Sequence, residues 1–175
     1  MSCAPLYTDR LVLRRWRNAD IAPFAAICAD EEVMRYIGDG STRTREQAAA
    51  SVARFESDWE KKGYGLYAVA YRDDDRLIGF AGFSQPDFLP EIMPGVEIGW
   101  RFGREHWGHG YATEAAREAL KYGLDELRLT TIVSVFQSAN EASRRIVRKL
   151  GMQFDRQTCD PSCGRPVEVY RTPPG

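Results

Sequence analysis

Apolar residues recur along this chain in two rhythms, at every second position in some segments and at every third or fourth in others. The first rhythm is typical of strands and the second of amphipathic helices. Strands are predicted at residues 10–16, 66–72, 76–84, 96–102, 129–136, 152–156 and 167–171. Helices are predicted after Asn18, after Thr44, at residues 110–126 and at residues 140–150. This alternation indicates one mixed α/β domain.

Several element ends carry their own signals. Asn18 is a residue type that favours the N-cap of a helix, and Thr44 followed by Gln47 has the spacing of a capping box. Gly63 is placed to end the second helix. The acidic run at residues 73–75 separates two strand patterns, which predicts an antiparallel hairpin.

Composition and charge exclude several classes of function. A chain of 175 residues with 43% hydrophobic and 28% charged residues is expected to fold as one domain over residues 1–175, with a core from about 8 to 171. The net charge is −1 and no segment is rich in lysine and arginine, so no nucleic-acid partner is expected. No apolar run approaches the roughly 18 residues that would span a bilayer, and the start MSCAPLYTDR lacks the features of a signal peptide. A cytoplasmic protein with no membrane partner is therefore predicted.

Cysteine and histidine are too few to suggest a metal centre. Cys159 and Cys163 form a C-x3-C pair, but two histidines in the whole chain leave little to complete a ligand set. No metal is expected, and free thiols in a reducing compartment fit this usage better than a disulfide.

The stretch HWGHGYATEA carries the first sign of chemistry. Gly108 and Gly110 stand where a predicted strand hands over to a helix, so unpaired main-chain N–H groups of the first helical turn can face an anion. A tight turn would explain the same two glycines. The nucleotide-binding pattern G-x-x-x-x-G-K-[ST] is absent, and there is no third glycine at the spacing of a dinucleotide fingerprint.

Four segments together resemble the GNAT superfamily of N-acetyltransferases, and more narrowly its branch of ribosomal-protein N-terminal acetyltransferases. They are TDRLVLRRW, VEIGWRF, EHWGHGYATEA and SANEASRRIVRKLGMQF, in order from about Thr8 to Tyr170. The resemblance implies an α/β fold of the α+β type: a mixed, mostly antiparallel six- to seven-stranded sheet with helices on both faces. Its two central strands splay apart, Gly99 is placed where a bulge would be inexpensive, and acetyl-CoA lies between the strands as co-substrate.

The same resemblance implies which residues bind the coenzyme. The main chain near Trp100 holds the pantetheine, and the main chain of residues 105–112 holds the pyrophosphate. The implied contacts are Trp100, Arg101, Phe102, Arg104, Glu105, Trp107, Gly108, His109, Gly110, Tyr111, Ala112 and Asn140. Family members usually have Gln or Arg where this chain has Glu105, so Glu105 is expected to turn to solvent while Arg104 covers the anion. His106 and His109 are expected to face solvent or the adenine.

Two residues are predicted to move protons during transfer of an acetyl group to a primary amine. Glu97 interrupts an apolar strand, so burial is expected to raise its pKa toward that of a general base; an ion pair with Arg101 is the alternative. The resemblance places Ser143 near the thioester sulfur as proton donor, with Tyr111 or Tyr170 as alternatives. Asn140 would contact the coenzyme arm, although a simple N-cap also explains it.

The sequence does not identify the amine that accepts the acetyl group. A protein N-terminus and a small-molecule amine both fit, and acids at Asp87, Glu91 and residues 30–32 suit a cationic acceptor or a plain solvated surface. Two other classes stay open: an acyl-CoA sensor without turnover, and a protein that binds ATP or NAD at the same helix. Homodimers are common among relatives, and the sequence does not decide between monomer and homodimer.

Overall fold

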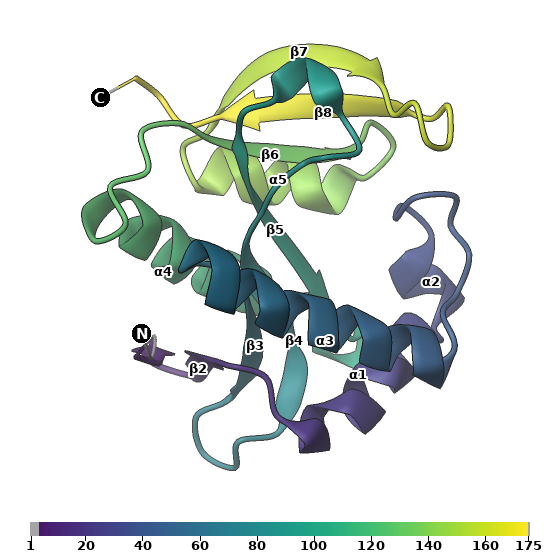
Figure 1. Cartoon of the computed structure of the whole chain (residues 1–175), viewed down its shortest axis with the longest axis vertical. Coiled ribbons are helices and arrows are strands. Elements are labelled where there is room, and N and C mark those ends of the chain that lie inside the picture. The colour runs from purple at the N-terminus through teal and green to yellow at the C-terminus, as the bar shows by residue number, and fades with distance from the viewer. Residues whose placement is uncertain (1–3, 175) are drawn as a thin grey trace.

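Strands and helices form largely where the two rhythms predict them (Figure 1). The computed structural model describes residues 4–174. Its strands are β1 (Leu6–Tyr7), β2 (Leu11–Arg14), β3 (Leu66–Tyr71), β4 (Leu77–Ser84), β5 (Val96–Phe102), β6 (Ile132–Gln137), β7 (Gln153–Cys159) and β8 (Pro166–Arg171). Its α-helices are α1 (Ile21–Cys28), α2 (Glu31–Met34), α3 (Arg45–Lys62), α4 (Tyr111–Asp125) and α5 (Glu141–Lys149). Short 3₁₀ turns lie at Asn18–Asp20, Pro90–Ile92 and Arg104–His106.

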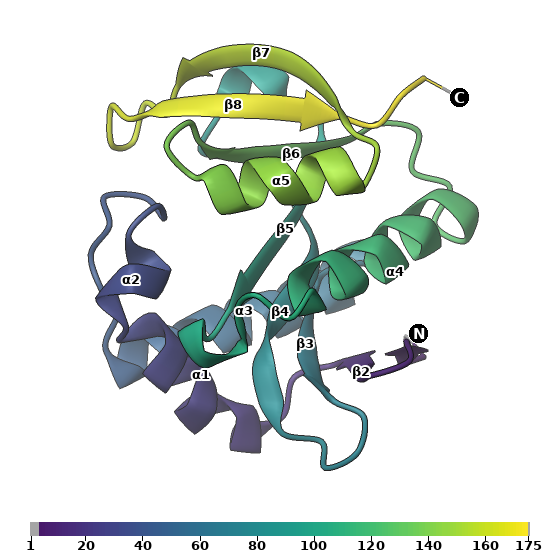
Figure 2. The same ribbon diagram turned by 180° about the vertical axis from the view of Figure 1, so that it is seen from behind.

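All the strands belong to one sheet, in the order β1-β2-β3-β4-β5-β6-β8-β7. Neighbours are antiparallel except β5 and β6, which are parallel and pair only at Val96–Ile132 and Glu97–Val133. Beyond that point β5 turns away from β6, as Figure 2 shows, and the predicted splay is confirmed. The predicted bulge at Gly99 is wrong, because β5 pairs with β4 without a register shift from Glu97 to Phe102. The short strand β1 brings the sheet to eight strands, one more than expected.

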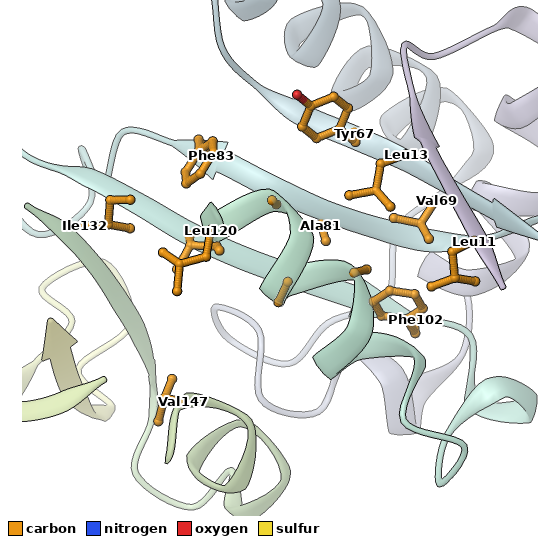
Figure 3. Packing of buried hydrophobic residues seen from close by; sticks show 14 of the residues in the cluster. Leu11, Leu13, Tyr67, Val69, Ala81, Phe83, Phe102, Leu120, Ile132 and Val147 are labelled. Carbon is orange, nitrogen blue, oxygen red and sulfur yellow. The ribbon is translucent and has the colours of Figure 1, made fainter. Parts of the chain in front are cut away.

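Helices cover both faces of the sheet, and in Figures 1 and 2 α3 and α4 lie on opposite sides of the central strands. The core under α4 includes Phe83 and Phe102 from the sheet and Leu120 from the helix (Figure 3). Small residues let α4 approach closely: a Cβ on Gly123 would lie 2.4 Å from the Phe83 ring. The second core, under α1 and α3, is built around an edge-to-face group of aromatic rings. Its rings come from Trp16, Phe24, Phe55 and Phe80.

Helix ends follow the sequence signals with one exception. Thr44 and Gln47 form the predicted capping box, with donor–acceptor distances of 2.9 and 3.2 Å, and Gly63 ends α3 at a φ of 73°. Asn18 is not an N-cap, because it lies inside a 3₁₀ turn. The Asp20 carboxylate accepts the Arg17 N–H at 2.8 Å instead, and it is also held by a buried arginine of β2.

The remaining differences concern short or irregular segments. The four-residue helix α2 was not predicted, although Val33 and Met34 anchor it in the core. β6 begins at Ile132 rather than at residue 129, and β7 extends to Cys159. Cys159 and Cys163 are free thiols in the structure. Within residues 4–174, no helix is both long enough and apolar enough to cross a membrane.

Candidate functional site

The divergence of β5 from β6 leaves main-chain groups of β5 facing a gap. The Gly103 N–H donates to the Ile78 carbonyl at 3.0 Å, which fixes the alternation of the antiparallel ladder. Odd-numbered residues of β5 therefore bond to β4, and even-numbered residues direct their N–H and C=O groups away from it. Trp100 presents both groups toward the gap, whereas the main chain of Arg101 is taken up by the ladder.

Trp107 closes the far end of this edge. Its indole Nε1–H donates to the Phe102 carbonyl at 2.9 Å, so that carbonyl is no longer open to a ligand. Nearly half of the Trp107 side chain remains exposed. The free edge of β5 thus narrows to the Ile98 carbonyl and the two main-chain groups of Trp100, because the parallel pairing of Glu97 with Val133 uses the Ile98 N–H.

The loop that follows β5 presents a row of unpaired donors. Gly108 and Gly110 have φ angles of 76° and 81°, in the region that favours glycine. The first helical bond of α4 runs from the Glu114 N–H to the Gly110 carbonyl. In the part of the chain that the structure describes, the main-chain N–H groups of residues 108–113 donate to no protein acceptor. Six consecutive unpaired donors at a helix N-terminus are suited to binding an anion, and we call this row of N–H groups the cradle.

Residues of the turn between β1 and β2 brace this loop, and sequence reasoning missed these contacts. The Arg10 guanidinium donates to the His109 carbonyl at 3.0 Å and forms an ion pair with Glu114 at 2.6 Å. The Thr8 hydroxyl donates to the same carboxylate at 2.6 Å, and Arg10 lies over the Tyr111 ring at 4.4 Å. The brace joins residues about a hundred positions apart, so only a three-dimensional structure reveals it.

The charged residues before the glycines take up separate positions. The Glu105 side chain is 78% exposed and contacts His106 Nε2 at 3.2 Å, so the acid points to solvent as expected. Arg104 pairs with Asp30 at 3.1 Å. The expectation that His106 faces solvent is wrong: it is buried, and its Nδ1 lies 2.9 Å from the Tyr71 hydroxyl. Burial lowers the pKa of His106, which favours the neutral ring.

Glu97 lies where β5 and β6 separate. Glu97 as a whole is partly exposed, but its carboxyl group is surrounded by protein. The resulting loss of hydration raises the pKa of this carboxyl group to about 8. Hydrogen bonding by the Val135 N–H and the Ser84 hydroxyl acts in the opposite direction. The predicted rise in pKa is confirmed. The alternative ion pair is not formed, since no carboxylate of residues 4–174 lies within 4.0 Å of Arg101.

Asn140 and Ser143 stand together at the start of α5. The Asn140 side-chain oxygen accepts the Ser143 N–H at 3.1 Å, so the capping interpretation of Asn140 is confirmed. This bond uses the main chain of Ser143 and leaves its buried hydroxyl available. The alternative donor Tyr111 packs on Tyr71 at 5.4 Å, and Tyr170 stacks on Phe136 at 5.6 Å.

The site therefore combines a cradle for an anion, a free strand edge and a carboxyl group with a raised pKa. In residues 4–174, no three His, Cys, Asp or Glu side chains are grouped so as to hold a metal ion. The cradle and the edge lie in series along the chain, at the end of β5 and at the start of α4. Such an arrangement fits an extended ligand that has amide groups along its length and a diphosphate at one end.

Comparisons with known proteins identify the family. Residues 10–153 match the acetyltransferase (GNAT) domain family. The uncharacterized N-acetyltransferase YoaA of Bacillus subtilis (strain 168) is 34% identical over 148 residues, which cover 85% of this chain and 82% of YoaA. The uncharacterized N-acetyltransferase YnaD of the same organism is 35% identical over 146 residues, which cover 83% of this chain and 81% of YnaD.

Two solved structures share the fold. The crystal structure of an acetyltransferase from Agrobacterium tumefaciens str. C58 has a TM-score of 0.84 at 24% identity, covering 99% of this chain and 96% of its own. RimL, a ribosomal L7/L12 alpha-N-protein acetyltransferase solved in complex with coenzyme A, has a TM-score of 0.78 at 11% identity, covering 97% of both chains.

Proposed function

The chain belongs to the GNAT family of acetyltransferases, and we propose that it moves an acetyl group from acetyl-CoA to a primary amine within a ternary complex. The observation that carries the proposal is the row of free N–H groups at residues 108–113 beside the open edge of β5. The proposed acceptor is either a protein N-terminus or a small-molecule amine.

In this proposal the main chain binds most of the coenzyme. The pyrophosphate accepts hydrogen bonds from residues 108–113, where the helix dipole adds partial positive charge. The pantetheine pairs with the N–H and C=O of Trp100, as an added strand pairs with a sheet edge. The Asn140 oxygen already caps α5, so its amide NH₂ is the group left to donate to the coenzyme arm.

Glu97 serves as general base. The amine nitrogen attacks the thioester carbonyl, a C–N bond forms, and the proton that leaves the nitrogen passes to the Glu97 carboxylate, directly or through one water. With a pKa near 8 the carboxyl group is a stronger base than an ordinary glutamate, although only part of it is ionised at neutral pH.

Ser143 serves as proton donor to the leaving group. When the C–S bond breaks, the thiolate takes the hydroxyl proton of Ser143 and leaves as the free thiol of CoA, and Ser143 takes up a replacement proton from a water molecule. The support for this role is that the hydroxyl is buried at the start of α5, while the Asn140 cap uses only the main-chain N–H of Ser143. A buried hydroxyl loses no hydrogen bond to bulk water when it donates.

Release of free thiol from acetyl-CoA with a broad panel of primary amines tests the proposal. Turnover with at least one amine is expected. Coenzyme binding without thiol release from any amine would favour a sensor instead, although its only support in the sequence, Glu105, points to solvent. Thermal shifts with CoA, ATP and NAD separate both from a nucleotide-binding protein, which would be stabilised more by the nucleotides.

A further inference from the structure

One face of β5 carries the groups that an acceptor would meet. Glu97, Gly99 and Arg101 share this face by the two-residue period of a strand, while Ile98 and Phe102 pack under α4 on the other. A Cβ placed on Gly99 would meet no atom within 4 Å. Open space therefore lies over Gly99, with a carboxyl group of raised pKa on one side and a guanidinium on the other.

Arg101 has no counterion in the described chain. The only hydrogen bond of its side chain among residues 4–174 runs from Nη1 to Cys28 Sγ at 3.4 Å, and its flat face lies over the Phe80 ring at 5.2 Å. The Nε–H is shielded from solvent and has no partner. Arg43 and Arg54 place further positive charge nearby, and the Cys28 sulfur acts in the opposite direction. A guanidinium that is partly removed from water is normally paired, because burying a charge without a partner is unfavourable.

Other arginines of this chain show what the unused edge of Arg101 can bind. Arg15 holds Glu56 through Nε and Nη2, and Arg144 holds Glu168 through the same two nitrogens. This fork is the geometry in which a guanidinium binds a carboxylate most strongly. In Arg101 the Nε and Nη2 edge has no protein acceptor among residues 4–174, while Nη1 is committed to Cys28.

We propose that the acceptor is an amine that also carries a carboxylate, a small amino carboxylate whose amine approaches Glu97 and whose carboxylate binds the free edge of Arg101. This inference rests on the proposed acetyl transfer. Glu97 and Arg101 are four residues apart, about 13 Å along a strand, and their side chains leave the strand on the same face, with the open space over Gly99 between them. A molecule of amino-acid size fits such a span.

The acids near this region do not compete for the same position. Asp30 is paired with Arg104, and Glu32 of α2 lies 3.6 Å from Arg35, the residue that follows this helix. Both pairs have exposed members, so their charges are largely screened by water. The enclosed charge with no partner is positive, and it selects an anionic group on the acceptor rather than a second cationic one.

Matched acceptors test the inference with the whole protein. Each L-amino acid in a panel is compared with its amide and with the amine that lacks the carboxylate, and kcat/KM is measured from thiol release. We expect wild type to favour the carboxylate at least tenfold for its best acceptor. Arg101→Gln should remove this preference and leave the Kd of acetyl-CoA within about twofold, and Arg101→Lys should restore part of it. Arg76→Gln, an exposed arginine in the turn before β4, is the matched control and should behave as wild type.

Peptides with an acidic side chain beside a free N-terminus, together with their amide counterparts, test a protein source of the carboxylate. We expect the preference for a carboxylate over its amide to be found among free amino acids only. A preference found among the peptides only would overturn the assignment of a small-molecule acceptor. Equal turnover of acid and amide by wild type would overturn the role of Arg101 while leaving acetyl transfer intact, and this comparison needs no variant. Coenzyme binding with no thiol release from any amine would instead overturn the proposed function itself.

Discussion

Replacing Glu97 by glutamine should raise stability at high pH and lower the rate of acetyl transfer, and both effects follow from the burial of the carboxyl group. The folded pKa of Glu97 is about 8 against an ordinary value of 4.5, so between these pH values the folded chain holds a proton that the unfolded chain has released. Wild-type stability should therefore fall as the pH rises from 4.5 to about 8. A glutamine side chain at this position stays neutral throughout and removes this dependence.

The size of the effect follows from the same pKa rise. At about 1.4 kcal/mol for each pH unit, a change from 4.5 to about 8 corresponds to at most about 5 kcal/mol. Glu97→Gln should therefore have nearly the stability of wild type below pH 4.5 and be more stable above pH 8. Urea unfolding at pH 4.5 and pH 9 measures both differences. Glu126→Gln, at an exposed residue after α4, is the matched control and should differ little from wild type at either pH.

Catalysis by the same variant should move in the opposite direction. Loss of a general base typically lowers kcat by 10²–10⁴-fold. With an acceptor amine that is neutral across the whole range, the wild-type rate should rise with pH and level off above about 8, and the variant should lose that rise. The difference in unfolding free energy between the variant and wild type should be larger at pH 9 than at pH 4.5. An equal difference at both pH values would mean that the carboxyl group is not desolvated. An unchanged pH–rate profile would remove Glu97 from proton transfer.

Three further substitutions test separate parts of the site. Ser143→Ala should lower kcat by about 10²-fold or more while the Kd of acetyl-CoA stays within about twofold, because the Asn140 cap contacts only its main chain; equal turnover in steady-state assays would exclude Ser143 as proton donor. Gly108→Val should abolish CoA binding, measured by calorimetry, and should lower the unfolding free energy by about 1–3 kcal/mol, because a Cβ at residue 108 meets no protein atom but the φ angle is positive. Retained CoA affinity would mean that the cradle is elsewhere. Glu114→Ala should weaken CoA binding by about tenfold, because Arg10 loses the ion pair that holds it against the loop. Thermal unfolding of the free protein distinguishes a local effect on the loop from general destabilisation, and undiminished CoA affinity would show that the brace is dispensable.

Local signals in the sequence predicted the elements whose causes are local. The capping box at Thr44, the glycine at residue 63 and the hairpin around residues 73–75 each depend on residues a few positions apart, and all three form. Asn18 failed as a cap for a reason that lies outside its segment. Arg14 in β2 needs a buried counterion, and it draws Asp20 into that role.

The candidate site divides in the same way. The glycine loop and Glu97 could be predicted from the sequence, because a strand–turn–helix boundary and an acid within an apolar strand are each defined by a few neighbouring residues. The brace between Arg10 and Glu114 and the unpaired charge of Arg101 were not, because both depend on which distant segments the sheet brings together. The burial of His106 against Tyr71 belongs to this second group.

A crystal structure of the protein with coenzyme A tests the central claim most directly, since that claim is a set of distances. The account predicts pyrophosphate oxygens within hydrogen-bond distance, roughly 2.7–3.2 Å, of several main-chain nitrogens of residues 108–113, with the pantetheine paired to Trp100 in the gap between β5 and β6. A pyrophosphate bound elsewhere, with those N–H groups still free, would contradict it.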